Sequence, residues 1–346
     1  MHRFNYMFLK NGNVPASYVQ SSFDIGQFSK AEDEIRREYP KAFEKMRSIA
    51  EIDSVKASNA IEHIVTTQNR IVEIIKGAKP LTHDEEEIAG YMNALEEIHS
   101  NYGNLQLDED TIKHFHEKLY SRSTRRLGGM YKTEDNVILQ YDDKGNASER
   151  FRPVSAADCG FCMNQLVLAY KEARQNGVCD LLLIPCVILD FLCIHPFSDG
   201  NGRVSRLLML LLYYRSGFDV GRYISLENQI LESQDYYYEA LFESSRGWNE
   251  NTNSYLPFIK YSLYVLFNCY RMLNSRFLSV NRKKGIKTQR IEAVVLSSII
   301  PISKEEIMRQ LPDVSVATVQ KALNRMTKEG RIKKVGTFRN ARYRKS

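Results

Sequence analysis

Apolar residues recur at intervals of three and four along most of the chain, which is the spacing of helices that bury one face. Residues 28–77 follow this pattern and predict one long helical stretch. Another helix is predicted after Thr82, whose hydroxyl can cap a helix that opens with the acidic run "DEEE". The helical spacing returns at Ala156 and continues to about residue 280. The pattern predicts a mainly α-helical protein.

The stretch 136–154 interrupts these helices with a different spacing. Val137, Leu139 and Tyr141 occupy alternate positions, and "DDKGN" supplies turn residues after them. "ERFRPV" is then a second extended run, which a proline ends. The alternation and the turn predict a β-hairpin.

The last part of the chain contains shorter elements. "NRKKGIKTQR" (281–290) is polar and basic, as linkers are, and two short helical patterns follow it. Ser315 is in position to cap the second of them, and "RIKKVGTFRNARYR" predicts a small hairpin, which completes the order of a winged helix-turn-helix. We therefore expect an N-terminal helical region at 1–85, a helical core with its following helices at 86–280, and a winged helix-turn-helix domain at 286–346.

Length and composition are those of a globular protein. The 346 residues, 43% of them apolar, suffice for one large core or several smaller ones. Charged residues and a proline interrupt the longest apolar run, "CDLLLIPCVILDFLCIHPF", so no segment has the length of a membrane span. The N-terminus lacks the apolar stretch of an export signal. We expect a cytoplasmic protein that does not bind membranes, and the sequence leaves a homo-oligomer open.

Charge is distributed unevenly along the chain. The net charge is +6, but residues 281–346 hold 17 Lys and Arg against 5 Asp and Glu, whereas the residues before them hold 31 against 37. A basic winged helix predicts DNA binding, with Lys321, Arg325 and Lys328 along one side of its second helix. Such modules also bind proteins, and this alternative stays open.

The cysteines do not indicate a disulfide framework, because six are too few for a chain of this length. Cys159 and Cys162 form the single CxxC pattern, "CGFC", without a second pair of Cys or His at metal spacing. Buried core thiols are the favoured interpretation, and a redox or zinc motif is the alternative.

The strongest chemical signal is "HPFSDGNGR" (195–203), a polar loop between two apolar helical runs. Gly200 and Gly202 allow a ligand to approach the backbone, and the free N–H groups of the helix that follows favour an anion. Arg203 is a bidentate partner for phosphate, and Arg206 lies three residues further on the same helical face.

Two further residues of the loop can take part in a reaction. Asp199 offers a hard oxygen ligand of the kind that a phosphate-bound Mg²⁺ accepts. His195 is a general base whose pKa can lie near neutrality. Any one of these residues could simply cap a helix or turn the chain. Together, within twelve residues, they indicate a site that handles nucleotides.

This stretch resembles a known family. "HPFSDGNGRVSR" is similar, position by position, to the HxFx(D/E)GNGRxxR signature of the Fic (Fic/Doc) family, whose typical members transfer AMP from ATP to a protein hydroxyl. "GMYKTEDNVIL…RFRPVSAAD" resembles the flap of that family, and "YYEAL" (237–241) resembles a segment found downstream. The resemblance covers roughly residues 50–245 and implies a Fic-like helical core with a β-hairpin flap.

The resemblance implies a role for each residue of the loop. His195 would deprotonate a Ser, Thr or Tyr hydroxyl of a target protein, and Asp199 would bind Mg²⁺ at the phosphates of ATP. Phe197 would pack beneath the loop and hold His195 in place. The residues that bind ATP and its phosphates would be Phe197, Gly200, Asn201, Gly202, Arg203 and Arg206. The reaction would be an in-line displacement at the α-phosphorus, with pyrophosphate as the leaving group.

A second motif lies upstream. "SNAIEH" (58–63) resembles the (S/T)xxxE(G/N) inhibitory helix of many Fic proteins, with Ser58 and Glu62 on one helical face. The resemblance implies that Glu62 pairs with Arg206 and so keeps ATP in a pose that cannot react. His63 departs from the family pattern, which has Gly or Asn at this position.

Two features of the Fic-like region allow two interpretations each. The 136–154 hairpin either adds a segment of the target protein as an extra strand or only covers the core. Tyr237 or Tyr238 either lines the adenine site or packs within a helix. The activity implied is that of a protein adenylyltransferase that uses ATP and Mg²⁺ and is inhibited by its own N-terminal helix.

Other activities compete with this interpretation. Some relatives transfer UMP, phosphocholine or phosphate, but the intact GNGR favours AMP, and removal of AMP with help from Glu62 stays open. From a different class, the chain would be a winged-helix DNA-binding regulator whose Fic-like site senses nucleotide. The presence of His195 favours the enzyme.

Overall fold

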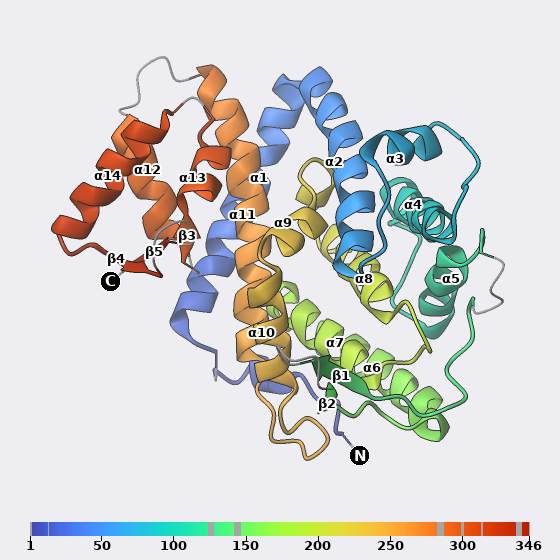
Figure 1. Cartoon of the computed structure of the whole chain (residues 1–346). Coiled ribbons are helices and arrows are strands. Elements are labelled where there is room, and N and C mark those ends of the chain that lie inside the picture. Colours follow the sequence, from blue (N-terminus) through green and yellow to red (C-terminus); the bar gives the residue numbers. More distant parts are fainter. Residues whose placement is uncertain are drawn as a thin grey trace. The chain divides into compact units, whose positions relative to one another are not determined.

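The computed structural model of the chain describes residues 2–12, 14–123, 128–141, 147–281, 287–298, 301–312, 314–336 and 341–345. The chain forms two compact units, Met1–Cys269 and Tyr270–Ser346. Helices make up most of the described residues (Figure 1), so the prediction of a mainly α-helical protein is confirmed.

The first unit is built mainly from helices. They are α1 (Ala16–Glu38), α2 (Pro40–Ile61), α3 (Gln68–Ile75), α4 (His83–Asn101), α5 (Glu109–Leu119), α6 (Ala156–Gln175), α7 (Asp180–Ile194), α8 (Asn201–Arg215), α9 (Leu226–Glu232) and α10 (Gln234–Ser245). One 3₁₀ turn (Met7–Leu9) precedes α1, another (Val220–Arg222) lies between α8 and α9, and α11 (Leu256–Asn281) continues into the second unit. Among the helices that the structure describes, none has both the length and the apolar character of a membrane span.

The predicted helical stretch 28–77 is three helices rather than one. Pro40 is the first residue of α2 and separates it from α1, because proline lacks a backbone N–H and disfavours a helical residue before it. Thr67 starts α3, since its hydroxyl accepts a hydrogen bond from the Arg70 N–H. Glu62 is consequently the C-cap of α2 instead of a residue inside a long helix.

α7 and α8 lie in the middle of this unit (Figure 1) and carry the polar loop between them. α7 is apolar almost all round, and every residue from Leu181 to Phe191 is buried. A helix of this kind must be enclosed by other elements, and α6, α8 and α10 pack against it. α8 contacts α2, α4 and α5 in addition. The loop therefore begins and ends in buried helices, which anchor both of its ends.

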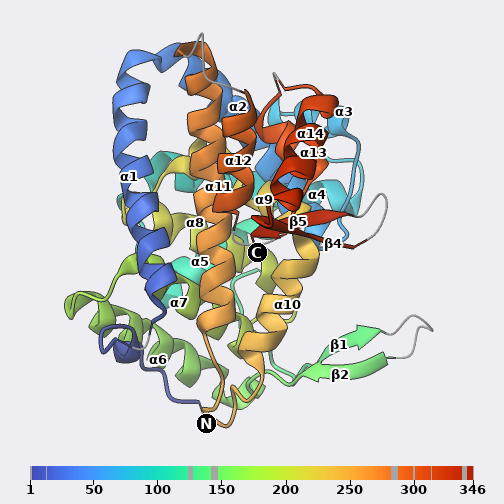
Figure 2. The same cartoon turned by 90° about the vertical axis from the view of Figure 1, so that its left-hand side faces the viewer.

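The predicted hairpin is present in the described residues. β1 (Ile138–Tyr141) and β2 (Ala147–Phe151) pair antiparallel, with Leu139 opposite Glu149, while the turn 142–146 lies outside the described residues. Figure 2 shows the two strands projecting from the helices of this unit.

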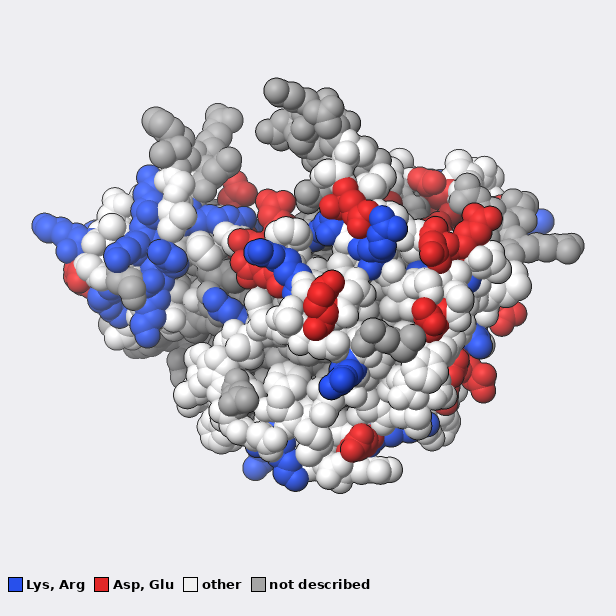
Figure 3. Space-filling view, turned by 90° about the horizontal axis from the view of Figure 1, so that it is seen from below, with Lys and Arg blue, Asp and Glu red and all other residues white. Residues whose placement is uncertain are grey.

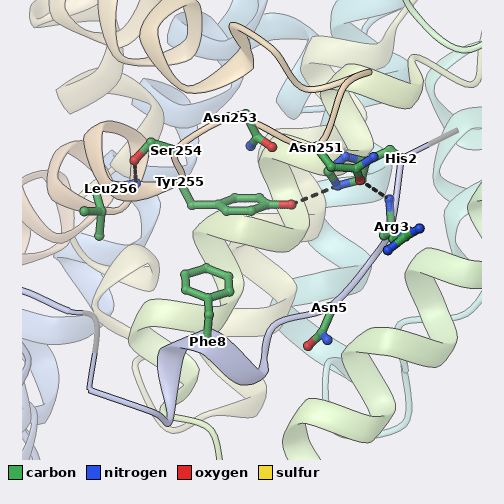
Figure 4. Close-up of a pocket in the computed structure, with 9 residues that line it drawn as sticks. All are labelled: His2, Arg3, Asn5, Phe8, Asn251, Asn253, Ser254, Tyr255 and Leu256. Atoms are coloured by element: carbon green, nitrogen blue, oxygen red, sulfur yellow. Dashed lines mark hydrogen bonds between the residues drawn. The ribbon is translucent and has the colours of Figure 1, made fainter.

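The N-terminal segment packs near a polar cluster around Asp190 of α7. Tyr6, Trp248 and Tyr255 each donate a hydrogen bond to the buried Asp190 carboxylate, at 2.7, 2.7 and 2.9 Å. A pocket of about 360 Å³ opens beside Tyr255, whose hydroxyl points to the His2 ring (Figure 4). The cluster ties α7 to the N-terminal segment and to the chain that precedes α11.

The second unit contains α12 (Lys287–Ser297), β3 (Ile302–Ser303), α13 (Lys304–Gln310), α14 (Val316–Lys328), β4 (Ile332–Val335) and β5 (Arg342–Lys345). Its strands form an antiparallel sheet in the order β3-β5-β4. Helices and sheet share a core that includes Ile307, Leu323 and Tyr343. The Ser315 hydroxyl caps α14 by accepting from the Thr318 N–H, as predicted. The assignment of this unit as a winged helix-turn-helix stays a prediction.

Cys159 and Cys162 are buried free thiols of α6. Burial raises the pKa of Cys159 to about 11, which keeps the thiol protonated and unreactive at neutral pH. The described ranges contain no group of three His, Cys, Asp or Glu side chains that could hold a metal. These observations agree with core thiols.

Candidate active site

His195 follows the last residue of α7 in a left-handed backbone conformation (φ 51°, ψ 61°). Its Nδ1 atom lies 3.3 Å from the carbonyl oxygen of Leu192. Because a carbonyl oxygen only accepts, Nδ1 carries the hydrogen and Nε2 keeps its lone pair. Burial lowers the pKa of His195 to about 4. The imidazole is therefore neutral at neutral pH and can accept a proton at Nε2.

The loop after His195 closes through Asn201, the first residue of α8. The Asn201 side chain accepts a hydrogen bond from the Phe197 N–H at 3.0 Å and donates one to the Phe197 carbonyl oxygen at 2.8 Å. The Phe197 ring is fully buried and stacks on the His116 ring of α5, with centroids 3.8 Å apart. Phe197 therefore packs beneath the loop, and the Asn201 amide is used within the loop.

At Gly200 and Gly202 any larger residue would be unfavourable, because of the backbone angle at the first and a close neighbour at the second. Gly200 is the N-cap of α8 with φ 78°, a conformation that favours glycine. A Cβ atom on Gly202 would collide with the Glu62 carboxylate. Glu62 thus lies directly over the first turn of α8, whose free N–H groups are the ones that would receive an anion.

Arg206 is held by the end of α2. Its Nε donates to Ser58 Oγ at 2.9 Å, and its Nη2 donates to the Ser58 carbonyl oxygen and to Glu62 Oε1, both at 2.8 Å. The Arg206 side chain is 2% exposed, whereas that of Glu62 is 34% exposed. The structure thus brings together three residues that the sequence singled out from two distant segments.

Arg203 is used differently. Its guanidinium forms a buried ion pair with Glu87 of α4, and its Nη2 donates to the Tyr120 hydroxyl at 3.1 Å. Its Nε is buried and has no hydrogen-bond partner within the described residues. The predicted phosphate contact of Arg203 stays a prediction.

Asp199 is the exposed acidic residue of the loop, and its Oδ1 accepts a hydrogen bond from the Gly200 N–H at 2.7 Å. Mg²⁺ is commonly held by one or two carboxylates together with substrate phosphates. A single exposed carboxylate beside an anion-binding turn fits an ion that arrives with a nucleotide. In the described part of the chain, three metal-binding side chains do not gather around it.

Comparison with known proteins agrees with this geometry. Residues 106–213 match the model of the Fic/DOC family. The matched range runs from the residues just before α5 to the second half of α8 and contains the whole loop from His195 to Arg203.

A curated relative supports the same family. A Fido domain-containing protein of Dictyostelium discoideum is 35% identical to this chain over 79 residues, which are 21% of this chain and 55% of the relative. The chain thus spans about half the length of the curated relative it matches.

Two solved structures are similar in fold. A Fic family protein from Desulfovibrio desulfuricans has a TM-score of 0.62 at 20% identity, and the similarity covers 96% of this chain and 97% of that one. A Fic domain containing signaling protein from Bacteroides thetaiotaomicron has a TM-score of 0.60 at 21% identity, over 72% of this chain and 94% of its own. These similarities support a Fic fold.

The departure from the Fic inhibitory motif has a structural explanation. His63 directly follows Glu62 and adopts a left-handed backbone with φ 61°. Gly and Asn, the residues of the family pattern, enter this region most readily, and His is also enriched there. His63 therefore turns the chain out of α2 directly after Glu62.

His116 is a site residue that the sequence analysis missed. Its Nδ1 accepts from the Gly129 N–H at 3.0 Å, and its Nε2 donates to the Asp199 carbonyl oxygen at 3.1 Å. Burial lowers the pKa of His116 to about 4, which keeps the ring neutral and both hydrogen bonds intact. Only its place on the apolar face of α5, between Ile112 and Leu119, could have drawn attention to it.

Lys132 is the second missed residue. Its backbone N–H donates to the Pro196 carbonyl oxygen at 2.8 Å, and its Nζ donates to Asn136 Oδ1 at 2.8 Å and to the Ile194 carbonyl oxygen at 3.3 Å. The side chain is 6% exposed, and burial lowers its pKa. Lys132 thus bonds to the residues on both sides of His195 and is a positioning residue. No feature of the sequence distinguishes it from a solvated lysine.

The two tyrosines considered for adenine binding lie on α10. Tyr237 is buried, and the Tyr238 hydroxyl donates to the Ile61 carbonyl oxygen at 3.4 Å. The Tyr238 carbonyl oxygen accepts from Arg150 Nη2 of β2 at 2.8 Å. α10 therefore links the hairpin to the end of α2, and a contact with adenine stays a prediction.

Proposed function

We propose that this protein transfers AMP from ATP to a Ser, Thr or Tyr hydroxyl of a target protein, and that Glu62 restrains the transfer. Fic family proteins commonly transfer nucleotide-derived groups to proteins. The observation that carries the proposal is the position of His195 at the start of the loop that opens α8, with Nδ1 hydrogen-bonded to the Leu192 carbonyl oxygen so that Nε2 keeps its lone pair.

His195 is the proposed general base. Its Nε2 takes the proton of the target hydroxyl while the hydroxyl oxygen attacks the α-phosphorus of ATP. The new oxygen–phosphorus bond forms as the bond to the bridging oxygen breaks, and pyrophosphate leaves with that electron pair. Positioning and electrostatics dominate such transfers, so a base held in place by the loop is sufficient.

The start of α8 is the proposed phosphate site. Gly200 and Gly202 carry no side chain, so a ligand could approach the backbone there once the Glu62 carboxylate has moved away from Gly202, and the N-terminal end of the helix favours negative charge. Arg206 Nη1 is buried without a hydrogen-bond partner in the described residues, so this arginine can accept a further anionic ligand. Mg²⁺ bound with ATP would neutralise charge on the phosphates, and Asp199 would hold it.

Glu62 is the proposed restraint. Its carboxylate occupies the Arg206 guanidinium and lies over Gly202. An ATP molecule denied Arg206 would place its α-phosphorus out of line with the incoming hydroxyl. A misplacement of about 1 Å can slow a reaction roughly a hundredfold.

The hairpin is the proposed docking place for the target protein. Val137, directly before β1, and Leu139 of β1 are 39% and 47% exposed, so the hairpin presents apolar side chains that a partner could cover. An extended target segment would add to this sheet through main-chain hydrogen bonds, which align a hydroxyl with little demand on sequence.

Labelled nucleotides test the proposal. Wild-type and Glu62→Gly proteins are incubated with a cell lysate and with ATP labelled at the α- or the γ-phosphate. AMP transfer labels protein from α-labelled ATP only, phosphate transfer labels it from γ-labelled ATP, and UMP transfer requires α-labelled UTP. If folded Glu62→Gly protein transfers no label from any of these nucleotides, the enzyme assignment is wrong. A nucleotide-sensing regulator is then the better interpretation.

A further inference from the structure

The second unit carries basic residues of two kinds. Arg325 and Arg331 both pair with Glu292, and Arg342 pairs with Glu306. Six others are exposed and form no ion pair within the described residues: Lys321, Lys328, Lys333, Lys334, Arg344 and Lys345. The predicted DNA-contacting residue Arg325 is therefore occupied inside the unit, and these six exposed side chains lie on α14, β4 and β5.

The hairpin of β4 and β5 places like charges next to each other. Lys333 lies directly opposite Arg344 in the antiparallel register, and both side chains are exposed. Ile332 and Tyr343, their neighbours in the strands, are buried and fix which side faces out. Like charges at opposed positions destabilise a hairpin. A bound polyanion would remove this repulsion.

The exposed face of α14 has a different chemistry. Val316 is 53% exposed in the first turn, and Gln320 and Asn324 follow at intervals of four residues. Gln320 is half-buried: its Nε2 donates to Asn324 Oδ1 at 2.7 Å, and its Oε1 accepts from Lys304 Nζ of α13 at 2.9 Å. Amides of Asn and Gln pair with adenine, and apolar side chains contact the methyl group of thymine. This face suits the edges of base pairs, not merely a charged surface.

We propose that the second unit binds duplex DNA, with α14 in the major groove and the β4–β5 hairpin on the phosphate backbone. The order α13, turn, α14 and hairpin is that of a winged helix-turn-helix, in which the second helix reads the groove. Figure 3 shows the Lys and Arg side chains of this unit gathered at the left of the view. The proposal does not depend on the proposed AMP transfer, because none of these residues belongs to the Fic-like site.

The first test measures how the affinity of the full-length protein for DNA depends on salt. A fluorescent mixed-sequence duplex of 24 base pairs is titrated with protein, and anisotropy is followed at several salt concentrations. Six phosphate contacts predict a loss of about a thousandfold in affinity between 50 and 200 mM salt. Absence of binding at 50 mM salt overturns the proposal.

A charge-reversal pair tests the surface. Lys333→Glu with Arg344→Glu should weaken binding at least tenfold and lower the slope of log affinity against log salt by about two. The matched control, Lys45→Glu with Lys171→Glu, makes the same charge change at exposed lysines of α2 and α6 and should stay within twofold of wild type. Equal losses in the two variants, with unchanged melting curves, would mean that net charge alone attracts DNA, and the proposed interface would be wrong.

Two further measurements separate DNA from other anionic partners. Polyglutamate should compete for the protein far less well than unlabelled duplex, and equal competition would assign the surface to acidic proteins instead.

Selection from a random duplex pool should yield a preferred sequence, which Gln320→Ala with Asn324→Ala removes while non-specific binding persists. A wild-type protein without any sequence preference contradicts the placement of α14. His195→Ala protein should bind DNA as wild type does, so failure of this proposal leaves the transferase proposal untouched.

Discussion

Glu62 Oε1 lies 2.8 Å from Arg206 Nη2, and this contact joins the C-cap of α2 to the second turn of α8. α2 itself is fixed to α9, since Ser54 Oγ donates to the buried Glu227 carboxylate at 2.7 Å. A phosphate accepts the same hydrogen bonds from a guanidinium as a carboxylate does. Release of the site is therefore expected to require a movement of the half-exposed Glu62 side chain and not of the helix.

Glu62→Gly is expected to raise AMP transfer, including transfer onto the protein itself, by about tenfold or more, because Arg206 becomes available to ATP. Transfer is measured as incorporation of label from α-labelled ATP. Glu62→Gln keeps the shape of the side chain and removes its charge, so its transfer rate should lie between those of the wild type and Glu62→Gly. Adding Arg206→Ala to Glu62→Gly should lower the rate again. Folded Glu62→Gly protein that transfers no faster than wild type would make "SNAIEH" an ordinary packed helix end.

His195→Ala should abolish transfer and leave the affinity for ATP within a few-fold of wild type, because the imidazole handles the proton of the hydroxyl and not the phosphates. The comparison is best made in the Glu62→Gly background, where transfer is easiest to measure. Transfer is followed with label, and ATP affinity by calorimetry. Undiminished transfer by the alanine variant would remove His195 from the reaction.

Asp199→Ala should weaken the part of ATP affinity that depends on Mg²⁺, because the only acidic side chain of the loop is lost. Titrations with ATP in the presence of Mg²⁺ and of EDTA measure this part. The affinity without metal should be the same in the wild type and the variant. If Mg²⁺ strengthens ATP binding equally in both proteins, Asp199 does not bind the metal.

Lys132→Met is expected to lower kcat at least tenfold while KM for ATP changes little, because the buried ammonium group holds the backbone at Ile194, next to His195. Lys132→Arg retains donors and a positive charge and should restore part of the rate. Asn136→Ala removes only the second partner of the ammonium group and should have the smaller effect. A Lys132→Met protein that loses ATP affinity instead would make the lysine a ligand of the nucleotide.

The parts of the site that could be predicted are those in which neighbouring residues share one function. The loop from His195 to Arg203 and the pair Ser58 and Glu62 are contiguous patterns, and the structure joins them through Arg206. The hairpin and the caps of α4 and α14 were also within reach, because strand alternation and capping depend on nearby residues.

The parts that could not be predicted depend on residues brought together by packing. His116 and Lys132 support the loop from segments more than sixty residues away, and nothing in their own surroundings indicates this. The sequence pattern predicts that Arg203 binds phosphate. Its ion pair with Glu87 could not be predicted, because Glu87 lies in another helix. Pro40 indicates a break in the 28–77 stretch, but the helical spacing on both sides of it favoured one continuous helix.

Asp190→Asn is expected to change how the stability of the protein depends on pH. Burial raises the pKa of Asp190 to about 7 despite three hydrogen bonds to its carboxylate. The unfolded chain has an ordinary aspartate with a pKa near 3.9, so the folded state retains a proton that the unfolded state has lost between these values. The contribution of Asp190 to the free energy of unfolding is therefore fully present below about pH 4 and is lost as the pH rises through 7.

The size of the effect follows from the two pKa values. Between pH 5 and pH 7, the wild type should lose on the order of 2 kcal/mol of unfolding free energy relative to Asp190→Asn. Urea unfolding at the two pH values measures both proteins, and the comparison cancels groups that they share, such as Glu32, whose pKa burial raises to about 8. Tyr6→Phe removes one donor to the carboxylate and should destabilise the protein by about 1–3 kcal/mol at pH 7, where Asp190 is partly charged. Identical pH dependence in the wild type and Asp190→Asn would mean that this carboxylate ionises with its ordinary pKa despite its burial.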